Sequence, residues 1–320
     1  MRCVALAQAW SAAGGNAVFV VAELPAGLQI HLRAEGFCFV PIAGRAERLD
    51  DAAATIRIAR DLHAIWVVVD GEAFGVEYLQ ALYESGLCVL LVDDFAARVS
   101  FPAHVVLNPN VGASEEAYRR KGSSAPLLLG ASHTPLRREF ISFNRDRVFP
   151  GLARRVLVTL GGSDPENLTP RIVETLCTLD GLHVIAVAGA GYEHLSELES
   201  LAAPNVTLIS NASNMSQLMH SSDLAITAAG GTLWELLYSR CPVISYTRNP
   251  VQARVVDWVA KRGAARDLGD TKDFAAAALS RAVEELAANR TLRQQMADVG
   301  RLLIDGRGPE RVIAAIRRMS

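Results

Sequence analysis

The sequence predicts an α/β protein with two doubly wound units. Short apolar runs alternate with helical patterns along all 320 residues, and 50% of the residues are hydrophobic. Most runs are continuously apolar, which is typical of parallel strands that are buried on both faces. A chain of this length is long enough for about two ordinary domains, so we expect a helix-covered parallel sheet in each half.

The expected elements begin with a helix. Leu6, Ala9 and Trp10 share one helical face, and a glycine pair then ends the helix. Strand-like runs of the first half follow at residues 17–21, 37–42, 65–70, 88–93 and 104–108. Those of the second half stand at 154–162, 182–191, 205–210, 223–231 and 241–246. Helical patterns fit between the strands, for example at 77–86, 170–181 and 214–222.

A polar stretch at 142–153, which carries a proline and a glycine, predicts the boundary between the halves. We expect an N-terminal domain at 1–147 and a second domain at 148–303. A glycine-rich turn and a last helix are expected at 304–320.

Composition and charge argue against several classes of function. The net charge is −2 without a long basic block, so nucleic-acid binding is not expected. No apolar run is long enough to cross a bilayer, and no signal peptide is visible. The five cysteines are scattered without metal-binding spacing, so we expect free thiols in a cytoplasmic protein that needs no metal and no cofactor.

Three strands of the second half run directly into glycines, in VLVTLGGSDPEN, VIAVAGAGYEH and LAITAAGGTLWELL. Such glycines let the backbone approach a diphosphate, and the following helix points its free N–H groups at the anion. Any tight strand-to-helix turn also uses glycine, but three in one half predict phosphate binding. Their spacing excludes a P-loop NTPase and disfavours a dinucleotide site.

Thr232 and Glu235 in the third turn allow two interpretations. Together they form a capping box, in which Thr232 caps the helix and Glu235 returns a hydrogen bond to the cap residue. Alternatively, Glu235 accepts hydrogen bonds from the two hydroxyls of a ribose, a task that suits a carboxylate because it has acceptors only. The local sequence favours the capping box.

Two longer stretches carry a resemblance to a known family, TLGGSDPENLT and NMSQLMHSSDLAITAAGGTLWELLYSRCPVI. They resemble the nucleotide-sugar hydrolases of pseudaminic acid biosynthesis (PseG type), which are related to the spore-coat polysaccharide protein SpsG and to the MurG transferase. The resemblance extends to LLVDDFAARV, VVLNPN, LLLGASHTPLRREF and DGRGPERV, and so covers nearly the whole chain. It implies a GT-B fold, with two Rossmann-like domains facing a cleft, and a UDP-linked diacetamido-trideoxy sugar as substrate.

The resemblance also implies a UDP site in the second half. The diphosphate is expected to lie against Gly161, Gly162, Ser163, Ala229, Gly230, Gly231 and Thr232. Glu235 matches the family's ribose-binding glutamate. Asn214 and Met215 fall where the family's backbone packs on uracil, although Asn214 is an equally good helix cap.

Sugar contacts are expected from both halves. In the first half, an Asp-Asp pair that ends with Asp94 and an Asn-x-Asn loop match the family, although turn chemistry explains both equally well. In the second half an Asn-Gln pair, here separated by an inserted Pro-Val, matches residues that face the sugar. The expected sugar contacts are Asp94, Asn108, Asn110, Asn249 and Gln252.

In the family, a strand and a Gly-x-Gly-His loop precede the first helix, and that histidine is the general base. This chain matches the family only from Met1-Arg2-Cys3 onward. We therefore expect that the chain starts downstream of the true start and that its first sheet lacks a central strand, which leaves the neighbouring strands with unpaired backbone groups. None of the first-half histidines is expected to replace the base: His31, His63, His104 and His133.

The sequence thus predicts hydrolysis of a UDP-sugar, with release of UDP and free sugar. The helix N-termini and loop amides would stabilise the departing diphosphate. The first alternative is a glycosyltransferase on the same fold, in which an acceptor hydroxyl replaces water. The second is a non-catalytic protein that binds UDP-sugars.

Overall fold

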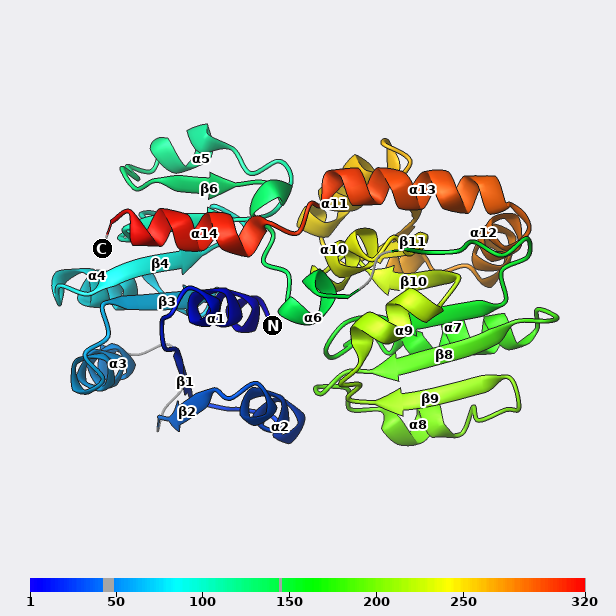
Figure 1. Cartoon of the computed structure of the whole chain (residues 1–320), viewed down its shortest axis with the longest axis horizontal. Coiled ribbons are helices and arrows are strands. Elements are labelled where there is room, and N and C mark those ends of the chain that lie inside the picture. The colour runs from blue at the N-terminus through cyan, green and yellow to red at the C-terminus, as the bar shows by residue number, and fades with distance from the viewer. Residues whose placement is uncertain (43–48, 144–145, 320) are drawn as a thin grey trace. The chain divides into compact units, whose positions relative to one another are not determined.

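The structure, a computed structural model, describes residues 1–42, 49–143 and 146–319. It divides the chain into two compact units (Figure 1). Unit 1 holds Met1–Arg138 together with Gly306–Ser320, and unit 2 holds Glu139–Asp305. Both units are built on parallel strands, as the sequence predicts.

Unit 2 contains one continuous sheet with the strand order β12-β11-β10-β7-β8-β9. The strands are β7 (Arg155–Thr159), β8 (His183–Ala188), β9 (Val206–Ser210), β10 (Leu224–Ala228), β11 (Val243–Thr247) and β12 (Arg266–Asp270). The chain runs outward from β7 to β9 and then returns to the other side of β7 as β10. The topological switch point therefore lies between β7 and β10, and ligands of open α/β sheets bind at the carboxyl ends of the strands at such a point.

The helices of unit 2 connect its strands and cover the sheet. They are α7 (Leu168–Cys177), α8 (Leu195–Glu199), α9 (Met215–Ser221), α10 (Gly231–Tyr238), α11 (Pro250–Ala260), the 3₁₀ turn η2 (Thr271–Asp273), α12 (Ala276–Ala288) and α13 (Arg290–Leu303). Ile172 of α7 and Val283 of α12 pack with Val158 of β7 and Ile226 of β10 in one fully buried cluster. This core fixes the ends of β7 and β10, from which the glycine turns leave.

Unit 1 contains two separate parallel sheets, with the orders β1-β2 and β3-β4-β5-β6. The strands are β1 (Val18–Val21), β2 (Cys38–Pro41), β3 (Trp66–Asp70), β4 (Cys88–Val92), β5 (Val105–Asn108) and β6 (Leu127–Leu129). Among the strands in the described residues, β1 and β3 each pair on one side only. The expectation that a central strand is missing from this sheet stays a prediction.

Helix α1 (Arg2–Ala12) packs against both sheets of unit 1. Leu6 lies in a cluster with Leu90 of β4 and with α14 (Gly308–Arg317), and Figure 1 shows α14 beside α1. Val4 and Ala7 pack instead with Phe37 and the β1-β2 layer. The remaining helices are α2 (Ala26–Ala34), α3 (Leu49–Asp61), α4 (Val76–Glu84), α5 (Glu115–Arg119), the 3₁₀ turn η1 (Ala131–His133) and, at the division of the units, α6 (Arg138–Ile141).

All ten predicted strands and the predicted first helix are present. Two further strands, β6 and β12, were not predicted. β6 has only three residues. β12 has the polar sequence RDLGD and stands at an edge of the sheet, so it carries no continuous apolar run.

The units divide at residue 138 rather than 147, and the expected last helix is present as α14 (Gly308–Arg317), which is part of unit 1. Arg147 donates to the carbonyl oxygens of Ser222 (2.6 Å) and His220 (2.8 Å) at the end of α9, which ties the stretch before β7 to unit 2. The C-terminal helix α14 belongs to unit 1 because its apolar face packs on α1 and β4.

Candidate functional site

The two glycines in the turn from β10 into α10 are exposed. Gly230 occupies the cap position of α10 with a φ of −105°, and no side chain of the described residues caps the helix. The N–H of Gly230 itself donates to the carbonyl oxygen of Ala228 at 2.8 Å. Neither Gly230 nor Gly231 lies in the left-handed region. A Cβ atom on either glycine would meet nothing within 4 Å among the described residues. Since neither conformation nor packing requires glycine here, the two glycines provide access to the N-terminus of α10.

The turn after β7 is closed by a side chain. Gly161 has a φ of +92°, a conformation that favours glycine. Asp164 is 3% exposed and accepts hydrogen bonds from the backbone N–H groups of Leu168 (3.2 Å) and Thr169 (2.8 Å) in the first turn of α7. The expectation that this helix offers free N–H groups to an anion is therefore wrong. Gly162 and Ser163 remain exposed at the turn.

The glycines after β8 are explained by packing. A Cβ atom on Gly189 would come within 2.4 Å of the carbonyl oxygen of Gly162, and the N–H of Gly191 donates to the same oxygen at 2.9 Å. The turn after β8 therefore packs against the backbone of the turn after β7. The helix that follows the β8 turn, α8, has only five residues, whereas α10 has eight. Since Asp164 caps α7, the turn after β10 is the one predicted phosphate turn that leads into a longer helix without a side-chain cap among the described residues.

The capping-box interpretation of Thr232 and Glu235 is wrong. The helix begins at Gly231 with Gly230 as its cap residue, so Thr232 lies inside the first turn and cannot cap it. Glu235 is one turn further along α10 and is 9% exposed. Ala229, which precedes the turn, donates its N–H to Tyr246 of the neighbouring strand. The ribose interpretation of Glu235 stays a prediction.

Asn214 and Met215 stand at the start of α9. Asn214 is the cap residue by position, yet its side chain accepts no hydrogen bond from the helix and is exposed. Its Nδ2 lies 3.4 Å from Oε1 of Gln217. The helix-cap interpretation is thus confirmed for the position of Asn214 and not for its side chain. Contact of these residues with uracil stays a prediction.

Asn249 and Gln252 cap helix α11 reciprocally. Oδ1 of Asn249 accepts from the backbone N–H of Gln252 at 2.9 Å, and Oε1 of Gln252 accepts from the backbone N–H of Arg248, also at 2.9 Å. Both side-chain oxygens therefore have a structural task, as in a capping box. Their amide NH₂ groups are the atoms left to meet a sugar, and that role stays a prediction.

Arg248 is a charged residue that the sequence analysis missed. It follows β11 directly, and its Nη2 donates to the carbonyl oxygen of Leu160 at 2.7 Å. Its guanidinium also forms ion pairs with Asp164 (3.4 Å) and Glu166 (3.0 Å). A cation directly after an apolar strand is the one signal that could have identified it.

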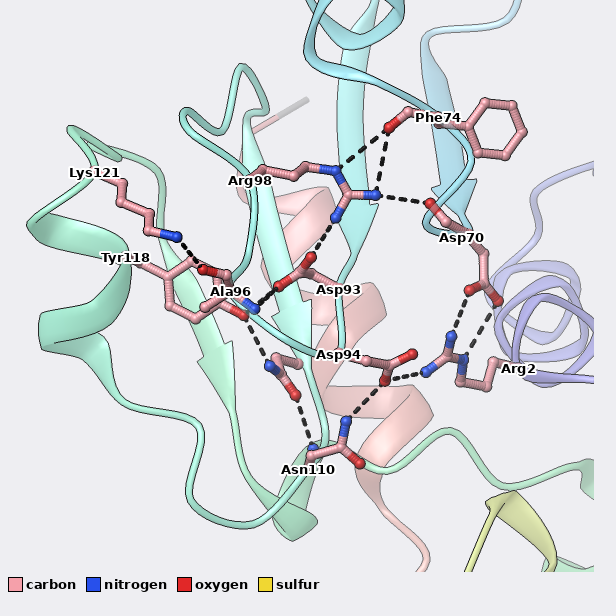
Figure 2. Close-up of polar contacts among 12 residues, drawn as sticks. Arg2, Asp70, Phe74, Asp93, Asp94, Ala96, Arg98, Asn110, Tyr118 and Lys121 are labelled. Atoms are coloured by element: carbon pink, nitrogen blue, oxygen red, sulfur yellow. Dashed lines mark hydrogen bonds and ion pairs between the residues drawn. The ribbon is translucent and has the colours of Figure 1, made fainter. Parts of the chain in front are cut away.

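A second cluster lies at the carboxyl ends of β3, β4 and β5 in unit 1 (Figure 2). Arg2 forms ion pairs with Asp70 and Asp94, both at 2.6 Å, and Nδ2 of Asn110 donates to Asp94 at 2.7 Å. Burial opposes the charge on Arg2, but its hydrogen bonds to Asp94 and Asp70 and their charges outweigh burial and raise the pKa of the guanidinium. The structure thus joins the predicted residues Asp94 and Asn110 by a direct hydrogen bond, and it adds Arg2, which sequence reasoning did not connect with them.

Asn108 and Asp93 lie beneath this cluster and are both 2% exposed. Asn108 donates to the hydroxyl of Tyr118 at 2.8 Å and accepts from the N–H of Asn110 at 3.0 Å. Asp93 pairs with Arg98 and accepts from Tyr118 at 2.8 Å (Figure 2). In this conformation Asn108 orders Asn110 and is not itself open to a ligand.

The four histidines of unit 1 have different surroundings. His63 precedes β3, His104 precedes β5 and His31 lies within α2, and burial lowers the pKa of His31 and His104. Only His133, of these four, follows the carboxyl end of a strand. Its Nδ1 lies 3.0 Å from the carbonyl oxygen of Leu129. Nδ1 also lies 3.2 Å from Oγ of Ser132, so which of its two neighbours it bonds depends on the tautomer of the ring.

No helix in the described part of the chain is long and apolar enough to cross a membrane.

No protein-family model matches the chain. A spore coat polysaccharide biosynthesis protein, SpsG of Bacillus subtilis, is 26% identical over 193 residues, which cover 59% of this chain and 57% of SpsG. The UDP-N-acetylglucosamine--N-acetylmuramyl-(pentapeptide) pyrophosphoryl-undecaprenol N-acetylglucosamine transferase of Symbiobacterium thermophilum is 32% identical over 181 residues, 52% of this chain and 48% of the transferase. The chain thus matches about half the length of these curated relatives.

Solved structures show the same fold over nearly the whole chain. MurG of Acinetobacter baumannii superposes with a TM-score of 0.66 and 16% identity, covering 99% of this chain and 95% of MurG. The spinosyn rhamnosyltransferase SpnG, complexed with thymidine diphosphate, gives 0.66 and 16% over 99% and 96%. MnaA of S. aureus, solved with UDP, gives 0.71 and 14% over 99% and 93%.

The resemblance to SpsG and MurG is therefore confirmed, whereas the specific resemblance to pseudaminic acid hydrolases is not. The two parallel α/β units and the likeness to these structures identify the fold of the chain as GT-B glycosyltransferase-like.

Proposed function

We propose that this protein is a glycosyltransferase that uses a UDP-linked sugar and binds its diphosphate at the N-terminus of α10. One observation carries the proposal. At the switch point of the unit 2 sheet, Gly230 and Gly231 hold open an uncapped helix N-terminus although neither backbone conformation nor packing requires glycine. A helix N-terminus combines free N–H donors with partial positive charge, which suits a diphosphate.

The remaining predicted contacts extend from this point. Glu235 on α10 would accept from the ribose hydroxyls, and Asn214 with Met215 would meet the uracil. The same fixed dipoles that bind the diphosphate would stabilise the charge that develops as UDP departs. Asp94, Asn110, Asn249 and Gln252 are the proposed sugar contacts.

Transfer is favoured over hydrolysis by the relatives. The relative from Symbiobacterium is named as a transferase, SpsG as a polysaccharide biosynthesis protein, and SpnG as a rhamnosyltransferase. An assay with a panel of UDP-sugars separates the two reactions. A transferase releases UDP only when an acceptor with a free hydroxyl is present, whereas a hydrolase releases UDP and free sugar from the UDP-sugar alone. Binding without turnover in both arms identifies a non-catalytic protein.

The variant Gly231→Ala tests the diphosphate site. The added Cβ points into open space in the protein, so folding is preserved, and alanine favours the helix over glycine by about 1 kcal/mol. The same methyl group stands where the diphosphate is to approach. We expect the Kd for UDP, measured by calorimetry, to rise about tenfold or more, which corresponds to ~1.4 kcal/mol.

Gly151→Ala is the matched control, because Gly151 also has open space around its Cα and no left-handed φ, but lies before β7 and away from the turn. It is expected to leave the Kd unchanged. Equal UDP affinity in Gly231→Ala and the wild type would contradict the proposed site.

A further inference from the structure

Arg248 extends across the end of the strand that carries the open turn. It leaves the carboxyl end of β11, and its guanidinium contacts the carbonyl oxygen of Leu160 just after β7. In the sheet, β10 lies between β11 and β7. The side chain therefore bridges two interstrand spacings, about 9–10 Å, past the carboxyl end of β10. The turn at Gly230 begins at that end.

The carboxylates that hold Arg248 are not equivalent. Asp164 is buried and already accepts from the backbone at the start of α7 and from the hydroxyl of Thr169 at 2.6 Å. The side chain of Glu166 is 34% exposed, and within the described residues its contact with Nε of Arg248 at 3.0 Å is its one polar interaction. Glu166 can thus move away at little cost, whereas Asp164 cannot.

The guanidinium of Arg248 also has unused donors. Nε is buried and makes no hydrogen bond to any described residue, because Glu166 lies near it but not in line with its N–H. In the hydrogen bonds that the Arg248 side chain makes to described residues, Nη2 is the donor each time. A guanidinium has five N–H donors, so those on Nε and Nη1 are not used in these bonds. A phosphate offers the oxygen acceptors that these donors lack, in the paired geometry that arginine binds best.

We propose that Arg248 is a latch that exchanges Glu166 for the diphosphate of the bound nucleotide. This inference rests on the proposed function, because it adds a cationic contact to the site at α10. Glu166 is then a competitor: it holds the guanidinium in place and its charge opposes the anion. Asp164 and the carbonyl of Leu160 keep the arginine at the end of β10 in both arrangements.

Calorimetric titration with uridine, UMP and UDP tests the latch. Arg248→Met is expected to weaken UDP binding about tenfold to a hundredfold, because a charge-assisted contact to the diphosphate is lost, and to leave uridine binding unchanged. Glu166→Gln is expected to strengthen UDP binding about threefold to tenfold, because it removes the competing charge. A purely structural ion pair predicts the opposite for Glu166→Gln, namely weaker or unchanged binding.

Glu285→Gln is the matched control. Glu285 pairs with Arg266 at 2.7 Å in an exposed ion pair of the same unit, and its neutralisation is expected to leave all three affinities unchanged. If Arg248→Met does not fold, Glu166→Gln alone decides the question. Unchanged UDP affinity in Glu166→Gln, with UDP binding by the wild type intact, overturns the latch and leaves the proposed function standing. Failure of the wild type to bind UDP overturns the proposed function itself.

Discussion

The sheets of the two units differ in how completely their strands are paired. In unit 2, β7 and β10 are each paired on both sides, and every residue of β10 is buried. In unit 1, β1 and β3 each pair on one side only among the described strands, and Val18 and Val68 are 37% and 38% exposed. Similar apolar runs thus form buried strands that are paired on both sides in one unit and partly exposed edge strands in the other. The number of neighbouring strands with which each strand pairs causes this difference in burial, and the local sequence does not encode that number.

The turns after β7 and β10 differ in whether a side chain caps the helix that follows. Both consist of a strand, two glycines and a helix, but Asp164 caps the N-terminus of α7, whereas no side chain in the described part of the chain caps α10. A capping carboxylate and a bound anion compete for the same N–H groups. In this chain the position three residues after the first glycine is the capping Asp164 in one turn and Leu233, which cannot accept a hydrogen bond through its side chain, in the other.

The largest expected difference between the units is in hydrogen exchange. Amides of β1 and β3 are expected to exchange about a thousandfold faster than those of β7 and β10, because strand edges without a partner open locally while a fully paired core strand opens only with the whole unit. Exchange followed by mass spectrometry measures this difference. Equal protection in both units would mean that the edges of β1 and β3 are covered in solution, which contradicts the divided sheet.

A pair of valine substitutions gives a smaller difference in stability. Val158 in β7 is fully buried, so Val158→Ala is expected to lower the free energy of unfolding of unit 2 by about 2–3 kcal/mol. Val20 in β1 is only half-buried, so Val20→Ala is expected to cost unit 1 less than about 1 kcal/mol. Urea denaturation of both variants measures the two costs. Comparable costs would show that β1 is as tightly packed as β7.

The sequence predicted the strands well because their continuous apolar runs report burial directly. It missed β12, whose five residues RDLGD include three charges and depend on β11 for pairing. It also missed the contacts of Arg2 and Arg248, because the partners of each arginine lie 68 to 92 positions away in the chain. The cap by Asp164 was missed although its backbone partners, Leu168 and Thr169, are near in the chain. The capping box failed for a local reason: the cap residue of the helix is Gly230, two positions before Thr232. Side-chain partners across a sheet edge require the fold, whereas strand identity does not.

The most direct test of the central claim follows backbone amides by NMR while UDP is added to ¹⁵N-labelled protein. The account predicts large, saturable shifts for Gly231 and Thr232 at the start of α10. It predicts clearly smaller shifts for Leu168 and Thr169, whose N–H groups Asp164 already holds. Saturable shifts centred on Leu168 and Thr169, or no shift at the α10 turn at saturating UDP, would contradict it.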